Sequence, residues 1–175
     1  MIFQNVKIVN TNKKVNMSKE ITKGQEIANF AFKEVGTVES PKNSNMTKYG
    51  AWFGFNGVAW CAMFVSYCYA KSGFHLPKIG YKNGYAGCQT AVKHFKETGE
   101  ITTNPKVGDI VFFDWNGDKR YDHTGIFNGW KDKENGIMYT IEGNTSLSNQ
   151  SNGGAVMSRK RSINNCIFVH PKVLD

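Results

Sequence analysis

One cysteine of this sequence, Cys61, stands where a thiol could act as a nucleophile. It opens the apolar run WCAMFVSYCYAKSG, which predicts a buried helix, and it follows the glycine-containing loop FNGVAW. The N–H groups at a helix start are unpaired and lie at the positive end of the helix dipole, so they favour a thiolate and could hold an oxyanion. The alternative is a small core residue, which is our interpretation of Cys68, two turns further along the same face.

A histidine that could serve this thiol as a base is His123, in the segment RYDHTGIF. It begins a predicted strand after a turn rich in Asp and Gly, so its ring can face a cleft while Ile126 and Phe127 enter the sheet and core. A histidine of this kind, taken alone, is more often structural or merely exposed. The other histidines have less suitable settings, which are a loop, an amphipathic helix and the end of the last predicted strand (His75, His94 and His170).

Two polar residues of the segment IEGNTS could orient such a histidine. Side chains two apart on a strand point to the same face, so Glu142 and Asn144 are predicted to reach one site. A cysteine–histidine hydrolase needs an acceptor that holds the imidazole in the productive tautomer, and either residue could supply it. The alternative is an exposed polar strand end.

Composition narrows the class of protein. The chain has 175 residues, the size of one domain, and 22 Lys and Arg against 14 Asp and Glu give a formal charge of +8. Such a surface favours polyanionic partners, although it also serves solubility. No run approaches the roughly 20 apolar residues of a membrane span, and the first residues lack the apolar core of a Sec signal peptide. The four cysteines include no CxxC pair, so we predict thiols and neither a zinc ribbon nor a thioredoxin-type site.

The elements that must position these residues are predicted to be helices followed by a sheet. Helical spacing predicts a helix that starts after Ser18 and ends at Gly36, and residues 37–57 read as an aromatic-rich loop. Two further helices are expected over Trp60–Gly73 and Gln89–Thr98, and strands over Val107–Asp114, Thr124–Gly129, Met138–Glu142 and Cys166–His170. This order indicates an α+β class with an antiparallel sheet, in one domain over 18–175 after an N-terminal extension over 1–17.

The order of these segments resembles the CHAP family, the cysteine, histidine-dependent amidohydrolases and peptidases, a papain-like group of phage endolysins, tail-associated lysins and bacterial autolysins. The matching stretches are AWCAMFVSYCYAKSG, PKVGDIVFFDW, DHTGIF and IEGNTS. The resemblance implies a papain-like CHAP fold, with N-terminal helices packed on a C-terminal antiparallel sheet. It also implies that Cys61 is the nucleophile, His123 the base and then the acid, Glu142 the group that orients His123, and Asn144 a supporting polar residue.

The activity that the resemblance implies is hydrolysis of an amide bond of peptidoglycan through a thioester. The enzyme would be an N-acetylmuramoyl-L-alanine amidase or a stem or cross-bridge endopeptidase. The oxyanion would sit on the backbone N–H of Cys61 and one further donor, for which the side chain of Asn56 is a candidate. Groove walls for the substrate are predicted from aromatic residues that could equally belong to the core: Trp52, Trp60, Trp115 and Tyr121.

Calcium is a further ligand to weigh, because some phage CHAP domains carry an acidic calcium loop just before the nucleophile. The segment before Cys61 has no Asp or Glu. A different cluster, DWNGDKRYD, places Asp114, Asn116, Asp118 and Asp122 next to the histidine, but it lacks the sixth-position glycine and twelfth-position glutamate of an EF-hand. We therefore expect no cofactor, and we interpret the cluster as an Asx-rich hairpin turn, with calcium as the weaker alternative.

The expected partner is bacterial cell-wall peptidoglycan, with no nucleic acid and no membrane insertion. The protein would be a monomer or part of a larger lysin or phage tail assembly, and without a signal peptide it would reach the wall by lysis, through a holin or on a phage particle. Three alternatives stay open. They are an NlpC-type endopeptidase, in which the nucleophile usually has an Asp-Cys-Ser-like context unlike Trp60-Cys61-Ala62, an antibacterial toxin with the same chemistry, and a non-catalytic basic module that binds the wall or nucleic acid.

Overall fold

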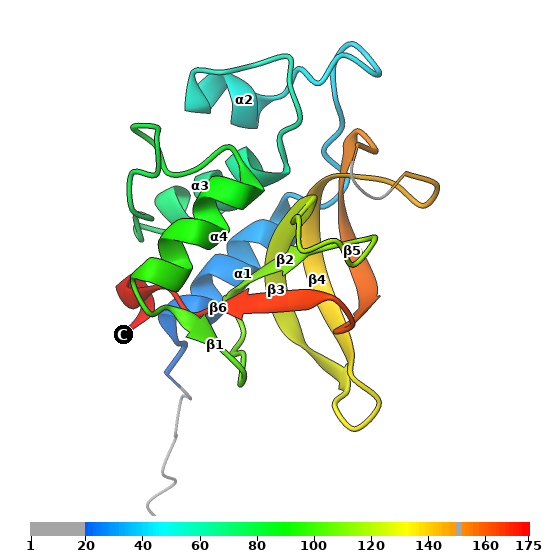
Figure 1. Ribbon diagram of the computed structural model, residues 1–175. Coiled ribbons are helices and arrows are strands. Elements are labelled where there is room, and N and C mark those ends of the chain that lie inside the picture. Colours follow the sequence, from blue (N-terminus) through cyan, green and yellow to red (C-terminus); the bar gives the residue numbers. More distant parts are fainter. Residues whose placement is uncertain (1–19, 150–151) are drawn as a thin grey trace, which may run out of the picture.

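The computed structural model describes residues 20–149 and 152–175, so the predicted extension over 1–17 and the predicted helix start at Ser18 lie outside the described residues. In this part of the chain, four α-helices precede a sheet of six strands (Figure 1). The helices are α1 (Lys23–Lys33), α2 (Lys48–Phe53), α3 (Cys61–Lys71) and α4 (Cys88–Glu97). The strands are β1 (Ile101–Thr102), β2 (Ile110–Phe113), β3 (His123–Asp132), β4 (Ile137–Thr145), β5 (Ala155–Ser162) and β6 (Cys166–Val169), followed by the 3₁₀ helix η1 (Lys172–Leu174). The predicted α+β class is confirmed.

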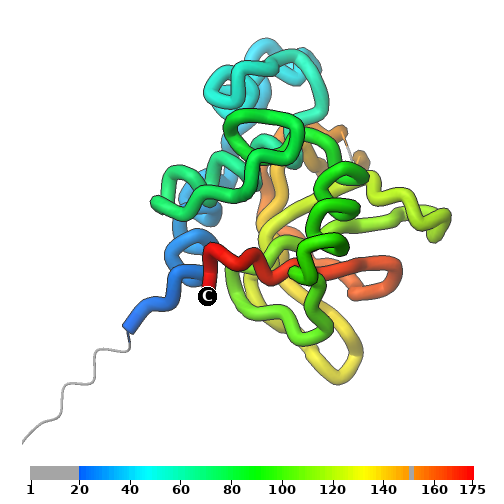
Figure 2. The backbone as a smooth tube through the Cα atoms, turned by 60° about the vertical axis from the view of Figure 1, so that its left-hand side comes forward, coloured from blue at the N-terminus to red at the C-terminus, as the bar shows by residue number. Residues whose placement is uncertain are grey.

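The strands form one antiparallel sheet in the order β1-β6-β2-β3-β4-β5. The last strand, β6, lies between β1 and β2, where Val169 pairs with Ile101 on one side and with Ile110 on the other. This insertion brings the C-terminal segment next to the start of α1, as two views show (Figures 1 and 2). Lys23 accordingly donates hydrogen bonds to the backbone carbonyls of Val173 and Asp175.

The sheet is buried on both faces. The face toward the helices carries apolar side chains of four strands: Ile110, Phe112, Ile126, Ile141 and Val169. A second cluster consists of Val111, Phe113, Phe127, Met138 and Phe168. Ile126 and Phe127 therefore both enter the core, as predicted, and because side chains alternate along a strand they belong to different clusters.

Helix α3 is the buried centre of the helical layer, and it packs on β3 and β4. It is apolar around most of its circumference, which is typical of a helix covered on all sides. Gly143 of β4 permits a very close approach, since a Cβ atom there would lie 2.6 Å from Phe64 Cβ and 2.7 Å from Trp60 Cζ3. This contact fixes the start of α3, and with it Cys61, relative to the middle of the sheet.

The observed elements depart from the predicted ones in three places. Helix α1 begins at Lys23, because Thr22 forms a capping box with Gln25; Ile21 therefore precedes the helix and is exposed. Helix α2 lies inside the predicted loop, with Thr47 capping the N–H of Gly50. Strands β1 and β5 were not predicted, since β1 is only two residues long and β5 has the polar sequence AVMSRKRS. None of the helices among the described residues has the length and apolar character needed to cross a membrane.

Candidate active site

Cys61 is the first residue of α3, and its side chain is 5% exposed. The preceding residue, Trp60, makes no side-chain hydrogen bond to the first turn, so that turn keeps unpaired N–H groups. The backbone of Ala62 is among the groups that lower the pKa of the Cys61 thiol. The predicted position of the thiol at a helix start is therefore confirmed, in a setting that favours the thiolate.

His123 is the first residue of β3 and is fully buried. Its Nε2 lies 3.1 Å from Glu142 Oε2, and its ring packs on those of Phe113 and Trp115 at centroid distances of 5.8 and 5.9 Å. These contacts fix the plane of the imidazole. Nδ1 has no partner at ordinary hydrogen-bond geometry, which leaves it for Cys61, the thiol that interacts with this ring. Contacts of this kind are often long in the absence of substrate.

Glu142 of β4 is fully buried and held from three sides. Besides His123, it accepts hydrogen bonds from Thr140 Oγ1 at 2.6 Å and from Arg161 of β5, whose Nε and guanidinium nitrogen lie 2.8 and 2.6 Å from its two oxygens. Gly125 leaves room for this carboxylate, since a Cβ there would lie 2.7 Å from Glu142 Cγ. The result is a hydrogen-bonded chain of Arg161, Glu142 and His123 that points the imidazole at the thiol.

The side chains of this site shift one another's pKa values and so determine one another's charges. Hydrogen bonding from Cys88 lowers the pKa of Cys61 well below its usual range; burial opposes this shift, and His123 adds to it. Burial would lower the pKa of His123, but its interactions with Cys61 and Glu142 outweigh this and raise the pKa to about 9. Burial likewise would raise the pKa of Glu142, but Arg161 and His123 hold it at about 2. At neutral pH the site is therefore a thiolate–imidazolium pair beside a carboxylate.

Two residues of this site were missed by the sequence analysis. Arg161 lies on β5, which was not predicted because its sequence is polar. The alternation of Arg161 with exposed neighbours was the available signal for a strand with one buried face. Cys88 is the first residue of α4 and follows Gly87, a setting that repeats that of Cys61 at α3. It is buried, and it lowers the pKa of the Cys61 thiol. All four cysteines are free, in agreement with the predicted thiols.

The two asparagines predicted at the site have settings that the pattern did not reveal. Asn144 is buried, but its backbone is left-handed (φ 57°) and it lies in an irregularity of the β4–β5 pairing, so simple alternation with Glu142 does not apply there. Its supporting role stays a prediction. The side-chain oxygen of Asn56 accepts hydrogen bonds from the N–H groups of Thr47 and Gly57 at 3.0 and 3.1 Å. Asn56 thus braces the start of α2 through its side-chain oxygen, and an oxyanion contact of its amide nitrogen stays a prediction.

The aromatic residues predicted as groove walls fall into two groups. Trp60 is fully buried, stacks on Tyr49 and donates its indole N–H to Glu39 at 3.0 Å, so it belongs to the core and the prediction of a groove wall is wrong. Trp52 is partly buried against Tyr67 of α3. Trp115 and Tyr121, which both precede His123 in the sequence, keep exposed surface.

The acidic segment before His123 uses its side chains to form a turn. Asp114 accepts the N–H groups of Gly117 and Lys119, both at 2.8 Å. Asp118 accepts from Asn116 and from the N–H of Arg120, and Asp122 accepts the N–H of Trp115. This geometry fits the Asx-rich turn. Among residues 20–149 and 152–175, no three His, Cys, Asp or Glu side chains are grouped so that they could hold a metal ion.

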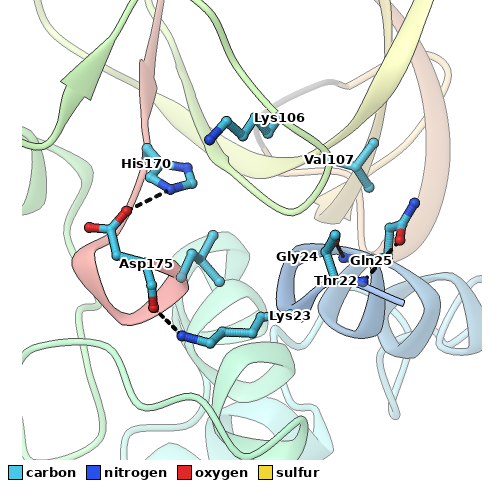
Figure 3. A pocket seen from close by; sticks show the side chains of 9 residues that line it. Thr22, Lys23, Gly24, Gln25, Lys106, Val107, His170 and Asp175 are labelled. Carbon is cyan, nitrogen blue, oxygen red and sulfur yellow. Dashed lines mark hydrogen bonds and ion pairs between the residues drawn. The ribbon is translucent and has the colours of Figure 1, made fainter. Parts of the chain in front are cut away.

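A cavity of about 390 Å³ lies away from these residues, between the start of α1, the loop at Lys106 and the C-terminal segment (Figure 3). His170, one of the competing histidines, lines it, and its ring nitrogens contact Asp109 at 2.6 Å and Asp175 at 3.3 Å. No cysteine lines this cavity. Lys23 and Asp175 are joined across its rim, as Figure 3 shows. We therefore interpret this histidine as a brace between β6 and the C-terminal segment.

The group of Cys61, His123, Glu142 and Arg161 has the parts that nucleophilic attack on a carbonyl requires. A thiolate can act as a nucleophile, an imidazolium can protonate a leaving group, and a carboxylate can keep the ring oriented. The model of the family described as CHAP domain matches residues 53–144, which include the first three of these residues. A comparison with curated proteins gave no match.

Proposed function

Because the chain belongs to the CHAP domain family, whose members are generally cysteine- and histidine-dependent amidohydrolases or peptidases acting on peptidoglycan, we propose that it cuts an amide bond of the bacterial cell wall with Cys61 as nucleophile. The observation that carries the proposal is the buried chain from Arg161 through Glu142 to His123, which ends at a thiol on a helix start. A thiol with only a packing role does not need an oriented imidazole or a depressed pKa.

The first half of the reaction forms a thioester. The Cys61 thiolate attacks the amide carbon, and the N–H groups at the start of α3 receive the developing oxyanion. His123, protonated at neutral pH because its pKa is about 9, transfers its proton to the leaving amine. The carbon–nitrogen bond breaks, and the acyl group stays on sulfur.

The second half returns the enzyme to its starting state. His123, now neutral, takes a proton from a water molecule that attacks the thioester carbonyl. The carbon–sulfur bond breaks, and the Cys61 thiolate and the His123 imidazolium form again. Glu142 stays ionised throughout, because Arg161 neutralises its charge in the buried site. This is the papain-like mechanism that the sequence resemblance implies.

The substrate would bind beside the start of β3, where Trp115 and Tyr121 are accessible. Trp115 is 37% exposed, stacks on Phe113 and covers the guanidinium of Arg161 at 5.0 Å, so it offers a fixed aromatic surface next to His123. Tyr121 lines a cavity of about 380 Å³ together with three lysines: Lys93, Lys96 and Lys119. Ammonium groups beside an aromatic ring suit a glycopeptide whose peptide carries free carboxylates.

The finer assignment is part of the same proposal. We favour a muramoyl-L-alanine amidase or a stem or cross-bridge endopeptidase, acting as a lysin of phage or autolytic type. An NlpC-type endopeptidase or an antibacterial toxin would use the same residues. Identification of the new chain ends, by mass spectrometry, distinguishes an amidase from an endopeptidase.

The test is turbidity loss of purified Gram-positive cell walls with the wild type, Cys61→Ala and the control Cys166→Ala. Cys166 is partly exposed on β6 and its thiol donates to the carbonyls of Ser162 and Asn164, so its loss removes a thiol without breaking a hydrogen bond of the site. We expect clearing by the wild type and the control, and a rate lower by at least about 10³-fold for Cys61→Ala. Equal clearing by Cys61→Ala would make Cys61 structural and overturn the mechanism. Binding without clearing by the wild type and both variants would favour the non-catalytic wall-binding module.

A further inference from the structure

Glu39 is a buried carboxylate outside the catalytic group. It lies on the segment between α1 and α2, and only 7% of its surface is exposed. Its Oε1 accepts the indole N–H of Trp60 at 3.0 Å, and within residues 20–149 and 152–175 its side chain has no other hydrogen bond and no ion pair. A carboxylate can accept about four hydrogen bonds, and a buried charge without a partner is costly. Most of the binding capacity of this side chain is therefore left for a ligand.

The Glu39 carboxylate lines a cavity of about 250 Å³. The walls come from two segments that pair with each other, since Val38 forms a bridge with Ala155 and the N–H of Glu39 donates to the carbonyl of Gly154 at 3.0 Å. Gly154 has a left-handed backbone (φ 78°), and a Cβ atom there would lie 3.3 Å from Glu39 Cδ. Glycine at this position therefore keeps space open beside the carboxylate.

The cavity lies at the same end of the sheet as the catalytic group. Because β3, β4 and β5 are antiparallel neighbours, the start of β3 at His123 and the start of β5 at Ala155 lie at one end. Two strand spacings amount to about 10 Å, which about three extended residues span. Trp60, the hydrogen-bond partner of Glu39, also directly precedes Cys61. A peptide with its cut bond at Cys61 therefore reaches the cavity about three residues away.

The charges of the cavity indicate the ligand. Lys42 also lines it and is exposed, so a positive group lies nearer to solvent than the buried carboxylate of Glu39. Calcium takes about 6–8 oxygen ligands, and the described chain groups no three acidic, histidine or cysteine side chains for a metal ion. One carboxylate and one ammonium group instead match a ligand with the opposite pair of charges. The free end of an amino acid, with an ammonium and a carboxylate on one carbon, carries that pair.

We propose that this cavity binds the free amino-acid end of a diamino acid in the wall peptide, with its ammonium group on Glu39 and its carboxylate on Lys42. The inference rests on the proposed function, because it takes the wall peptide as the substrate. Glu39 is then a specificity residue. It selects peptides in which this amino group is free and disfavours those in which cross-linking has converted it into an uncharged amide.

The experiment uses a soluble muropeptide that ends in meso-diaminopimelic acid, with its side-chain amine free or acetylated. Titration calorimetry measures both affinities for Cys61→Ala, in which the proposed nucleophile is absent. We expect acetylation to weaken binding by roughly 10-fold or more, because it removes a charge-assisted hydrogen bond. Addition of Glu39→Gln should weaken binding of the free amine to the same extent and leave the acetylated probe unaffected. Glu134→Gln, the charge-matched control in an exposed turn, should change neither affinity.

Two further comparisons separate binding from a structural role. Glu39→Gln keeps an oxygen that can accept the indole N–H of Trp60, so a residue that only braces Trp60 predicts unchanged affinities. Lys42→Met should weaken binding of the free probe, and it should have no effect when the carboxylate beside the amine is amidated. Lys160→Met, at an exposed position of β5, is the control for the lost positive charge.

Equal affinity of the free and acetylated probes for the protein that retains Glu39, or no binding of either probe, would overturn the inference. This comparison changes only the probe, so it decides the matter even if Glu39→Gln fails to fold. Wall clearing by the wild type tests the proposed function separately. Amine-dependent binding without clearing would reject the hydrolase and keep the binding site, whereas clearing without amine-dependent binding would reject the site alone.

Discussion

Glu142 and Arg161 form the buried ion pair on which the orientation of His123 depends. Both are buried, and each carboxylate oxygen has a guanidinium hydrogen bond. A buried pair of this kind contributes little net stability, because desolvation offsets the attraction. Removing one member, however, leaves an uncompensated charge. The catalytic group is therefore sensitive to a residue that does not itself touch the thiol.

Replacement of Arg161 should test this dependence. Arg161→Met keeps an unbranched apolar chain but leaves the Glu142 carboxylate without its main partner, so we expect a loss of about 3–5 kcal/mol in the free energy of unfolding. Urea denaturation measures this loss, and wall clearing should slow as well. Lys160→Met, at the exposed neighbouring position of β5, is the matched control and should change neither. If Arg161→Met were as stable as the control, the Glu142 carboxylate would not depend on its ion pair with Arg161.

The pH dependence of the rate should follow the thiolate–imidazolium pair. The rate on a soluble muropeptide should fall above pH about 9 as His123 loses its proton, and it should fall in acid as the Cys61 thiolate is protonated. Glu142→Gln removes a negative charge that raises the pKa of His123, so the alkaline limb should move to lower pH. The control is Glu134→Gln, in the exposed turn between β3 and β4. If the alkaline limb of Glu142→Gln stayed at the wild-type pH, Glu142 would not be a group that raises the pKa of His123.

The same shifts predict how stability depends on pH. The pKa of His123 is raised from 6.5 to about 9, so its contribution is fully present below pH 6.5 and is lost as the pH rises through about 9. The pKa of Glu142 is lowered from 4.5 to about 2, so its contribution is present above pH 4.5 and is lost as the pH falls through about 2. Between pH 4.5 and pH 6.5 both contributions are fully present, and the site stabilises the fold with His123 protonated and Glu142 ionised.

Among the elements, the proposed active site is a junction between the start of α3 and the strands β3 and β4. The thiol comes from a helix and the imidazole from a strand, so their separation depends on how closely the two elements pack. Gly143 sets that distance, because any side chain there meets Phe64 Cβ and the Trp60 ring. Phe64 Cβ is too near its own backbone to move aside, so a substitution must displace the helix.

Gly143→Ala should therefore impair catalysis more than folding. We expect destabilisation of about 1–3 kcal/mol from overpacking and a drop in kcat of about 10²-fold, because a misplacement of about 1 Å has an effect of that size. Thermal denaturation and single-turnover kinetics measure the two effects. Tyr139→Phe, at an exposed position of the same strand, serves as the control. A folded Gly143→Ala protein with the wild-type kcat would show that the junction tolerates displacement.

The sequence predicted most of the elements, because they follow the hydrophobic pattern. Helices α3 and α4 and strands β2, β3, β4 and β6 lie where apolar periodicity indicated them. Helix α2 and strand β5 were missed, since the first is a short turn held by the Thr47 cap and the second carries charged side chains on an edge of the sheet. Pattern alone does not distinguish such an edge strand from a loop.

The catalytic candidates were predicted only in part, because sequence patterns show element ends and not tertiary contacts. Cys61, His123 and Glu142 lie at element ends with recognisable sequences, and they are brought together as expected. Arg161 and Cys88 were missed because their importance comes from tertiary contacts with Glu142 and Cys61. Trp60 was assigned to the groove because sequence does not distinguish a buried indole with a carboxylate partner from an exposed one.

At the scale of the whole molecule, the formal charge of +8 favours encounter with an anionic wall. The local counterpart is the cavity beside Tyr121, where Lys96 lies 5.6 Å from the centre of the tyrosine ring and Lys119 is a further lining residue. Long-range attraction and local binding can be separated, because only the first depends on total charge irrespective of position.

A matched pair of double variants makes this separation. Lys96→Ala/Lys119→Ala and Lys131→Ala/Lys160→Ala remove the same charge, but only the first changes the cavity. We expect the first to raise KM on soluble muropeptides by about 10-fold, equivalent to about 1.4 kcal/mol, with kcat nearly unchanged. The second should leave KM unaltered. Equal effects of the two would attribute binding to total charge and remove the cavity as a subsite.

Detection of the acyl-enzyme would show whether Cys61 is the nucleophile. The wild type is mixed with a soluble muropeptide, quenched in acid within a single turnover and digested for mass spectrometry. We predict an adduct on the Cys61 peptide with the mass of the acyl part of the substrate, absent from Cys61→Ala and present in Cys166→Ala. Turnover of the muropeptide with no adduct on Cys61, or with Cys61→Ala as active as the wild type, would contradict it.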